Sequence, residues 1–157
     1  MSWTYDDLPI DLETVANGFG FVYIITNLAT QRQYIGRKLF TKVAYKTTKG
    51  KRKRIRVSSG WENYWGSNKT LLEDVMTMGE SNFHRRILRF CANRSECAYW
   101  ETYYIFDRAA LLSDSYYNEW VTCKISKRHL TKNKAWQEFQ AVLKCSCGFV
   151  KYYNIWI

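Results

Sequence analysis

The hydrophobic pattern near the start of the chain predicts a β-hairpin. Apolar residues run almost without interruption through residues 19–26 (FGFVYIIT), on both faces that an alternating strand presents. This pattern is typical of a strand buried on both sides. A short polar stretch at residues 27–31 separates it from a second segment at residues 33–38 (QYIGRK). Two such segments joined by a few polar residues favour antiparallel pairing.

A helix and a third strand are predicted after the hairpin. Ser67 or Asn68 can cap a helix over residues 69–78, and Gly79 suits its end. Residues 83–91 (FHRRILRFC) have apolar positions that favour a strand, although the same spacing permits a helix.

The longest helical pattern spans residues 95–112. Aromatic residues lie on most sides of this segment, so we expect it to be the central, largely buried helix. After a polar turn at residues 113–120, we expect a helix near residues 132–143 and a terminal strand over residues 149–157. No internal repeat or linker divides the sequence, so these elements predict one α+β domain with a short C-terminal extension.

Composition supports one folded domain and argues against several other classes. Of the 157 residues, 46% are hydrophobic and 17% aromatic, which suffices for one core and differs from the composition of disordered chains. No stretch of about 18 apolar residues occurs, so we expect no membrane partner. The first residues carry acids where a secretion signal has a basic flank, and the five cysteines are irregularly spaced. We therefore expect reduced thiols and a cytoplasmic location.

Positive charge is concentrated in one segment. The net charge is +10, and no acid lies between Glu13 and Glu62, where eleven lysines and arginines occur. We expect residues 39–58 to form a charged loop or ribbon that reaches away from the core. Such a field attracts polyanions and makes nucleic acid the leading partner, the alternative being a solvated surface. The candidate nucleic-acid contacts are Lys49, Lys51, Arg52, Lys53, Arg54, Arg56 and Lys69.

Glu101 is the most informative acid. On the predicted helix it lies on the same side as Ile105 and other apolar residues, which places its carboxylate at the inward face. An unpaired carboxylate is costly to bury, so it requires a cation. That cation is either a metal ion or an arginine at helical spacing, Arg94 or Arg108.

Tyr23 and Tyr34 form a second candidate pair, one on each strand of the predicted hairpin. Buried phenols usually fill a core, and that alternative stays open. Their setting favours chemistry, because Gly36 allows a backbone or a phosphate to approach closely. Arg37 and Lys38 follow at once. Two phenols, a bare backbone and two cations suit a phosphodiester.

These motifs resemble the two-part signature of the GIY-YIG nuclease superfamily. FVYIITN and YIGRK place Tyr23 and Tyr34 at its two tyrosine positions. Glu101 falls where the superfamily has its metal-binding glutamate, and Asn118 in YYN matches its late asparagine. The intervening segments are similar to phage-borne Seg-like or homing-type endonucleases. Two departures occur: Phe21 replaces the usual glycine, and the basic insertion displaces the helix that usually carries an arginine after YIG.

The resemblance spans about residues 19–118 and implies a small α+β domain in which helices flank a three-stranded antiparallel sheet. It divides the chain into an N-terminal extension over residues 1–18, a nuclease domain over residues 19–120 and a C-terminal extension over residues 121–157.

The resemblance also implies hydrolysis of phosphodiester bonds in DNA, with Mg²⁺ or Mn²⁺ bound by Glu101. One of the two tyrosines would orient or deprotonate the attacking water, and Arg37 and Lys38 would offset charge on the scissile phosphate. Asn118 would fix the geometry near the metal through hydrogen bonds. A phage-encoded enzyme of this kind acts in the cytoplasm of the bacterial host.

Two other functions remain open from the sequence. The chain is either a catalytically inactive nucleic-acid-binding module that uses the basic segment, or a structural protein that assembles through exposed aromatic residues. Cys123 with Cys145 and Cys147 is a poor match to structural zinc patterns. The sequence makes no prediction of the oligomeric state or the DNA target.

Overall fold

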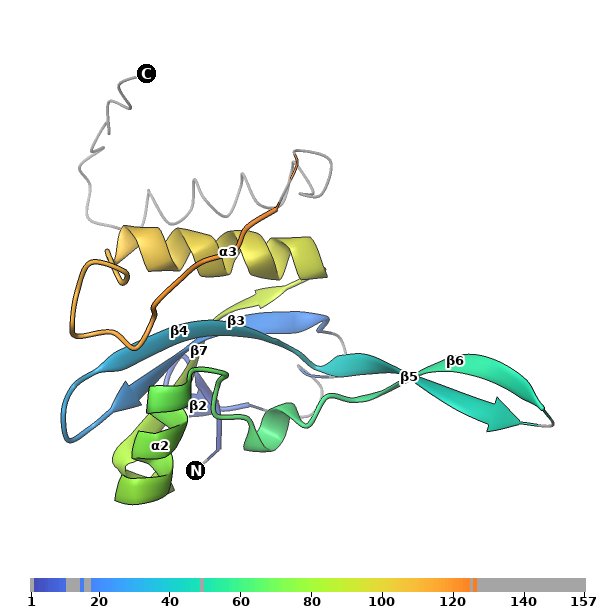
Figure 1. Cartoon of the computed structure of the whole chain (residues 1–157), viewed down its shortest axis with the longest axis horizontal. Helices are drawn as coiled ribbons and strands as arrows, with labels where there is room; N and C mark the ends of the chain where they lie inside the picture. Colours follow the sequence, from blue (N-terminus) through green and yellow to red (C-terminus); the bar gives the residue numbers. More distant parts are fainter. Residues whose placement is uncertain (1, 11–14, 16–17, 49, 125, 127–157) are drawn as a thin grey trace. The chain divides into compact units, whose positions relative to one another are not determined.

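The structure, a computed structural model, describes residues 2–10, 15, 18–48, 50–124 and 126 (Figure 1). The chain divides into two compact units, residues 1–125 and 126–157, and every helix and strand named below belongs to the first. The helix predicted near residues 132–143, the predicted terminal strand, and Cys145 and Cys147 lie outside the described residues. None of the described helices has the length and apolar character needed to cross a bilayer.

The central sheet is mixed and has five strands, whereas the sequence predicted three antiparallel strands. The strands lie in the order β2, β1, β7, β3, β4. Their bounds are Thr4–Tyr5 (β1), Leu8–Pro9 (β2), Gly20–Asn27 (β3), Gln33–Leu39 (β4) and Phe83–Cys91 (β7). The two additional strands come from the N-terminal segment, where Thr4 of β1 lies opposite Arg86 in a parallel pairing. A two-residue strand is too short to show a period in sequence, and the buried side chain of Trp3 fixes this segment to the core.

The predicted hairpin is confirmed. β3 and β4 pair antiparallel, with Tyr23 opposite Gly36 and Ile25 opposite Tyr34. β3 is buried along almost its whole length, as its two apolar faces predicted, because it lies between β7 and β4. The strand favoured for residues 83–91 is β7.

Of the helices that the structure describes, α2 begins after one of the two capping residues that the sequence favoured, and α3 begins after Asn93, for which the sequence made no prediction. α2 (Lys69–Met78) has the predicted bounds, and the side chain of Asn68 accepts a hydrogen bond from the Leu71 amide at 2.9 Å. α3 (Arg94–Asp107) begins one residue before its predicted start and ends five residues before its predicted end. The helix stops there because Ala109 has φ of 49°, in the left-handed region.

The helices cover opposite faces of the sheet (Figure 1). The face toward α2 holds the main hydrophobic core. Its members are Trp3, Phe21, Tyr23, Ile25, Phe40, Trp61, Trp65, Leu71, Val75, Phe83, Ile87 and Tyr117. The opposite face packs on α3. Because side chains alternate along β4, Tyr34 points toward the α2 face and Arg37 toward the α3 face. Groups from the two faces therefore meet at this edge strand.

The basic insertion forms a separate antiparallel ribbon, β5 (Thr41–Thr48) and β6 (Lys51–Ser58). The ribbon extends away from the five-stranded sheet, which the sequence predicted as one of two forms for this segment (Figure 1). At its base the Ser59 amide donates to the Phe40 carbonyl at 3.0 Å, and the Phe40 side chain is buried in the main core. The ribbon is thus fixed at its base, while nearly all of β6 is exposed.

Candidate active site

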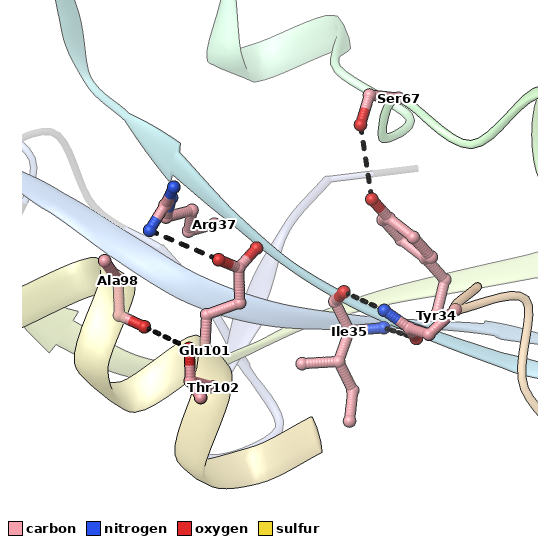
Figure 2. Close-up of polar contacts among 8 residues, drawn as sticks. Tyr34, Ile35, Arg37, Ser67, Ala98, Glu101 and Thr102 are labelled. Carbon is pink, nitrogen blue, oxygen red and sulfur yellow. Dashed lines mark hydrogen bonds and ion pairs between the residues drawn. The ribbon is translucent and has the colours of Figure 1, made fainter. Parts of the chain in front are cut away.

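Glu101 pairs with an arginine of the sheet and not with one of its own helix. Arg37 Nη1 of β4 lies 3.3 Å from Glu101 Oε2 of α3 (Figure 2). The pairings with Arg94 or Arg108 that helical spacing suggested are therefore wrong for the described state. Arg37 Nη1 is buried and makes no hydrogen bond within the described part of the chain, so the contact is an ion pair without hydrogen-bond geometry.

Burial disfavours the charged form of Glu101. It raises the pKa of this carboxyl, and the positive charge of Arg37 offsets part of that effect. The side chain of Glu101 is 18% exposed, so it still reaches the solvent. The carboxylate therefore lies where an additional cation would relieve an electrostatic cost.

The two candidate tyrosines lie close together on the α2 side of the hairpin. Their ring centroids are 6.2 Å apart, and the Tyr23 ring is almost fully buried. The hydroxyls of Tyr34 and Ser67 share a hydrogen bond of 3.3 Å (Figure 2). Burial raises the pKa of both phenols, so the phenols hold their protons at neutral pH.

The space above Gly36 is used by a tyrosine. A Cβ built on this glycine would overlap the Tyr23 hydroxyl and lie 3.0 Å from the Tyr34 ring. The sequence predicted that Gly36 admits a backbone or a phosphate. The structure corrects this, because the Tyr23 phenol crosses the bare Cα instead, with its hydroxyl beside the edge strand.

Asn118 holds the backbone of the edge strand. Its Oδ1 accepts a hydrogen bond from the Ile35 amide at 2.9 Å, and its Nδ2 donates to the Ile35 carbonyl at 2.8 Å. Just before it, the Tyr117 amide donates to the Gln33 carbonyl at 2.8 Å. Both ends of the Asn118 amide are thus engaged by β4, which fixes the strand between Tyr34 and Gly36.

One cavity at the sheet edge brings most of the predicted site residues together. It has a volume of about 400 Å³, and we call it the active-site cavity. Its predicted lining residues are Tyr23, Tyr34, Arg37, Lys69, Glu101 and Asn118. Lys38 is absent from this lining, although it shares the α2 face of β4 with Tyr34; its ammonium lies 3.6 Å from the centroid of the Tyr64 ring, which does line the cavity.

Several further residues line the active-site cavity that the sequence did not assign to the site. They include Tyr64, Ser67, Glu119 and Trp120. The signal in the sequence that marks Tyr64 is the aromatic cluster around it, formed by Trp61 and Trp65. Trp120 is 70% exposed, which a tryptophan next to YYN in the sequence does not reveal.

The donor set suits a hard cation that keeps most of its own water. The described residues contain no group of three His, Cys, Asp or Glu side chains that would enclose a metal ion. Glu101 supplies a single carboxylate at a cavity large enough for several waters. Mg²⁺ and Mn²⁺ accept such sites, because they bind through one or two carboxylates and retain water ligands. Glu101 therefore fits the metal-ligand position that the resemblance implied.

The candidate nucleic-acid contacts occupy two places. Lys51, Arg52, Lys53, Arg54 and Arg56 lie on β6 and are exposed. Lys69 stands at the active-site cavity, where it pairs with Glu73 at 3.7 Å. Lys49 lies outside the described residues.

The chain matches one protein family over most of its length. The match covers residues 3–121, and the family is described as "Putative endonuclease segE, GIY-YIG domain". No curated protein and no solved structure matches the chain. The matched range includes every strand and helix that the structure describes, with the N-terminal strands β1 and β2 among them. The chain therefore belongs to the SegE family of GIY-YIG endonuclease domains.

Proposed function

We propose that this protein is a metal-dependent DNA endonuclease that hydrolyses phosphodiester bonds. The observation that carries the proposal is the convergence of Glu101, Arg37 and Tyr34 on the active-site cavity. Phosphodiester hydrolysis needs an oriented water, a cation for the growing negative charge and a stabilised leaving oxygen. Around one cavity, a carboxylate can hold a metal cation, a guanidinium can bind the phosphate, and phenols can orient the water.

Arg37 is the residue best suited to bind the scissile phosphate. Its Nη1 has no hydrogen-bond acceptor in the described part of the chain, and its ion pair with Glu101 leaves the other guanidinium nitrogens free for a ligand in the active-site cavity. A guanidinium binds phosphate oxygens through charge-assisted hydrogen bonds. Those bonds strengthen as charge accumulates on the phosphate in the transition state.

Glu101 would hold the metal ion. A bound Mg²⁺ or Mn²⁺ supplies positive charge to the leaving oxygen and acidifies water. The raised pKa of Glu101 supports this role, because a cation at the cavity compensates for the burial of the carboxylate.

Tyr23 and Tyr34 would act as protonated phenols that orient the attacking water by hydrogen bonds. Burial raises the pKa of both groups, which opposes a role as phenolate base. Asn118 acts as a positioning residue, because its two hydrogen bonds to Ile35 hold the strand segment on which Tyr34 lies. Lys38 would act indirectly, by fixing the Tyr64 ring.

The same proposal includes a phage-encoded enzyme of the homing type or of low specificity. Its support is the match to a segE endonuclease domain. The alternative, a catalytically inactive nucleic-acid-binding module, is favoured by one observation, the exposed basic ribbon.

The test is the nicking of supercoiled plasmid by the full chain with Mg²⁺, with Mn²⁺ or with EDTA. We expect cleavage that requires the metal, and we expect Glu101→Gln to lower the rate by about 1,000-fold, as for loss of a principal electrostatic contact. Salt-sensitive DNA binding by this variant should persist, because Glu101 contributes no positive charge. DNA binding without any metal-dependent cleavage would favour the inactive module. Absence of both at low salt would contradict both functions and favour a structural protein.

A further inference from the structure

The β5–β6 ribbon sorts its positive charges by type onto two faces. Side chains alternate along each strand, and directly paired residues share a face. In the ribbon Tyr45 pairs with Arg54, and Lys46 pairs with Lys53. The register therefore gives one face the arginines and the other face the lysines. The arginine face carries Arg52, Arg54 and Arg56, and the lysine face carries Lys42, Lys46, Lys51 and Lys53.

The arginine face continues into a groove that leads to the active-site cavity. This groove, of about 650 Å³, is lined by Arg54 and Arg56 of the ribbon and by Arg37 and Arg94 of the main domain. Arg37 lines the active-site cavity as well. Among the described lysines of the ribbon, Lys42 at the base lines the groove, and the others do not. The groove shares Arg37 with the active-site cavity, and four arginines line it together with two lysines at its base, Lys38 and Lys42.

The charges on the arginine face are not neutralised by the protein. The ion pairs found among the described residues are Arg37–Glu101 and Lys69–Glu73, and neither belongs to the ribbon. Arg52 lies 4.0 Å from the ring centroid of Tyr45, so an aromatic contact orients it on the arginine face. A row of exposed, unpaired guanidinium groups repels itself and gains from an extended polyanion.

We propose that the arginine face and its groove bind backbone phosphates of duplex DNA next to the bond held in the active-site cavity. This inference rests on the proposed nuclease function. Each strand of the ribbon has eight residues. Such a strand spans about 26 Å at roughly 3.3 Å per residue, which corresponds to about eight base pairs at 3.4 Å each. The major groove also admits a two-stranded ribbon, and exposed cationic side chains form charge-assisted hydrogen bonds with phosphate. The lysine face adds only to the general positive field.

Two double variants test the assignment, because they remove the same charge at interleaved positions of one strand. R52Q/R54Q alters the arginine face, and K51Q/K53Q alters the lysine face. The measurement is binding of a mixed-sequence duplex of about 30 base pairs, longer than the reach of the ribbon, in EDTA over a range of salt. For R52Q/R54Q we expect about 100-fold weaker binding, as for two lost charge-assisted contacts, and a salt slope smaller by about 2. For K51Q/K53Q we expect a loss of about threefold from the field alone.

A third variant separates phosphate contacts from base recognition. R52K/R54K keeps the charges on the same face, and phosphate accepts lysine as well as arginine. We expect this variant to bind within about fivefold of the unchanged protein on any duplex sequence. A loss as large as that of R52Q/R54Q, or one that depends on sequence, would overturn the phosphate assignment, because guanine readout requires the fork.

Three other results would also overturn the inference: equal losses for R52Q/R54Q and K51Q/K53Q, no binding by the unchanged protein, or tighter binding of a duplex RNA of the same sequence. Cleavage of plasmid by the unchanged protein is measured separately. Cleavage together with equal losses for the two double variants would support the nuclease function and contradict DNA binding by the arginine face. A selective loss of binding for R52Q/R54Q without cleavage would support DNA binding by the arginine face and contradict the nuclease function.

Discussion

The active-site cavity and the β5–β6 ribbon use arginine in opposite settings. Arg37 lies in the main sheet, 3.3 Å from an acid, with its side chain 31% exposed. Arg52, Arg54 and Arg56 lie on an exposed strand outside every ion pair found among the described residues. A paired and half-buried cation is held at one position, where it can act on one phosphate. An unpaired and exposed cation acts through charge and tolerates movement.

This difference predicts that the two regions respond differently to mutation. Changes around the cavity should alter the stability of the fold together with catalysis, because Tyr23 belongs to the core, Tyr34 and Arg37 lie on the sheet, and Asn118 is hydrogen-bonded to β4. Changes in the ribbon should alter DNA binding and leave stability unchanged.

The largest effect on stability is expected for Gly36→Ala. The new methyl group would overlap the Tyr23 phenol, which is almost fully buried and cannot move freely. Overpacking of this kind costs about 1 to 3 kcal/mol, and the displaced phenols should reduce cleavage as well. The measurement is the free energy of unfolding in urea.

A double-mutant cycle with Tyr23→Phe sharpens this prediction. Removal of the hydroxyl relieves the overlap with the phenol oxygen but leaves the ring carbon Cζ 2.6 Å from the added methyl group, so the cost of Gly36→Ala should be only partly smaller in the Tyr23→Phe background. Equal costs in both backgrounds would mean that the Tyr23 hydroxyl contributes nothing to the overlap above Gly36.

The next effect is expected for Asn118→Ala. This change removes the hydrogen bonds of 2.9 and 2.8 Å to the Ile35 backbone. Two such bonds contribute about 2 kcal/mol together, so the free energy of unfolding measured in urea should fall by about that amount. Asn118→Asp keeps the acceptor for the Ile35 amide but sets a carboxylate oxygen against the Ile35 carbonyl oxygen, where two acceptors repel, so it should cost at least as much. If Asn118→Ala lowered cleavage without any loss of stability, its role would lie at the metal and not at the strand.

The sequence predicted those parts of the fold whose signal is local. Asn68 caps α2 at its predicted start, and the apolar run of β3 predicts a strand with both faces covered. Strands β1 and β2 have two residues each, so they carry no hydrophobic period and form only because β7 offers a free edge. These strands depend on pairing with a strand far away in the sequence, and a local hydrophobic pattern does not report such pairing.

The candidate site divides in the same way. The positions of Tyr23, Tyr34 and Glu101 follow from motifs, and the structure brings them to one cavity. The pairing of Glu101 with Arg37 did not follow, because helical spacing offered nearer arginines and the true partner lies on another element. The function of the Asn118 amide also depends on the path of the chain along β4, which the turn sequence does not specify.

A smaller effect concerns pH. Burial raises the pKa of Glu101, so the folded protein holds a proton on this group at pH values where the unfolded chain has released it. The stability that comes from this group is fully present at low pH and is lost as the pH rises through its pKa in the folded protein. The glutamine in Glu101→Gln does not titrate, so the stability of this variant does not fall in this way. As the pH rises from the pKa of the unfolded glutamate to that of the folded protein, the variant should therefore gain stability relative to the unchanged protein, by about 1.4 kcal/mol for each pH unit by which the pKa is raised.

Arg37→Gln provides the matched variant for this pH dependence. This substitution removes the positive charge that lowers the pKa of Glu101. The free energy of unfolding should therefore fall more steeply with rising pH than in the unchanged protein. Urea unfolding at several pH values measures both slopes. If the difference in free energy of unfolding between Glu101→Gln and the unchanged protein did not change with pH, the carboxylate would be hydrated and not buried.

The smallest effect on stability is expected when the ribbon is shortened. Val43 and Arg56 face each other in the register, so an Asn-Gly turn placed between them in exchange for residues 44–55 closes the hairpin near its base. The removed segment contributes no residue to the main core, and the side chain of Tyr45 within it is 57% exposed. The free energy of unfolding should therefore stay within about 0.5 kcal/mol, as for surface changes in general. DNA binding should fall at least as far as in R52Q/R54Q, because Arg52 and Arg54 are both lost. A large loss of stability would instead make the ribbon part of the folding unit, and the contrast between a structured cavity and an independent charged arm would no longer hold.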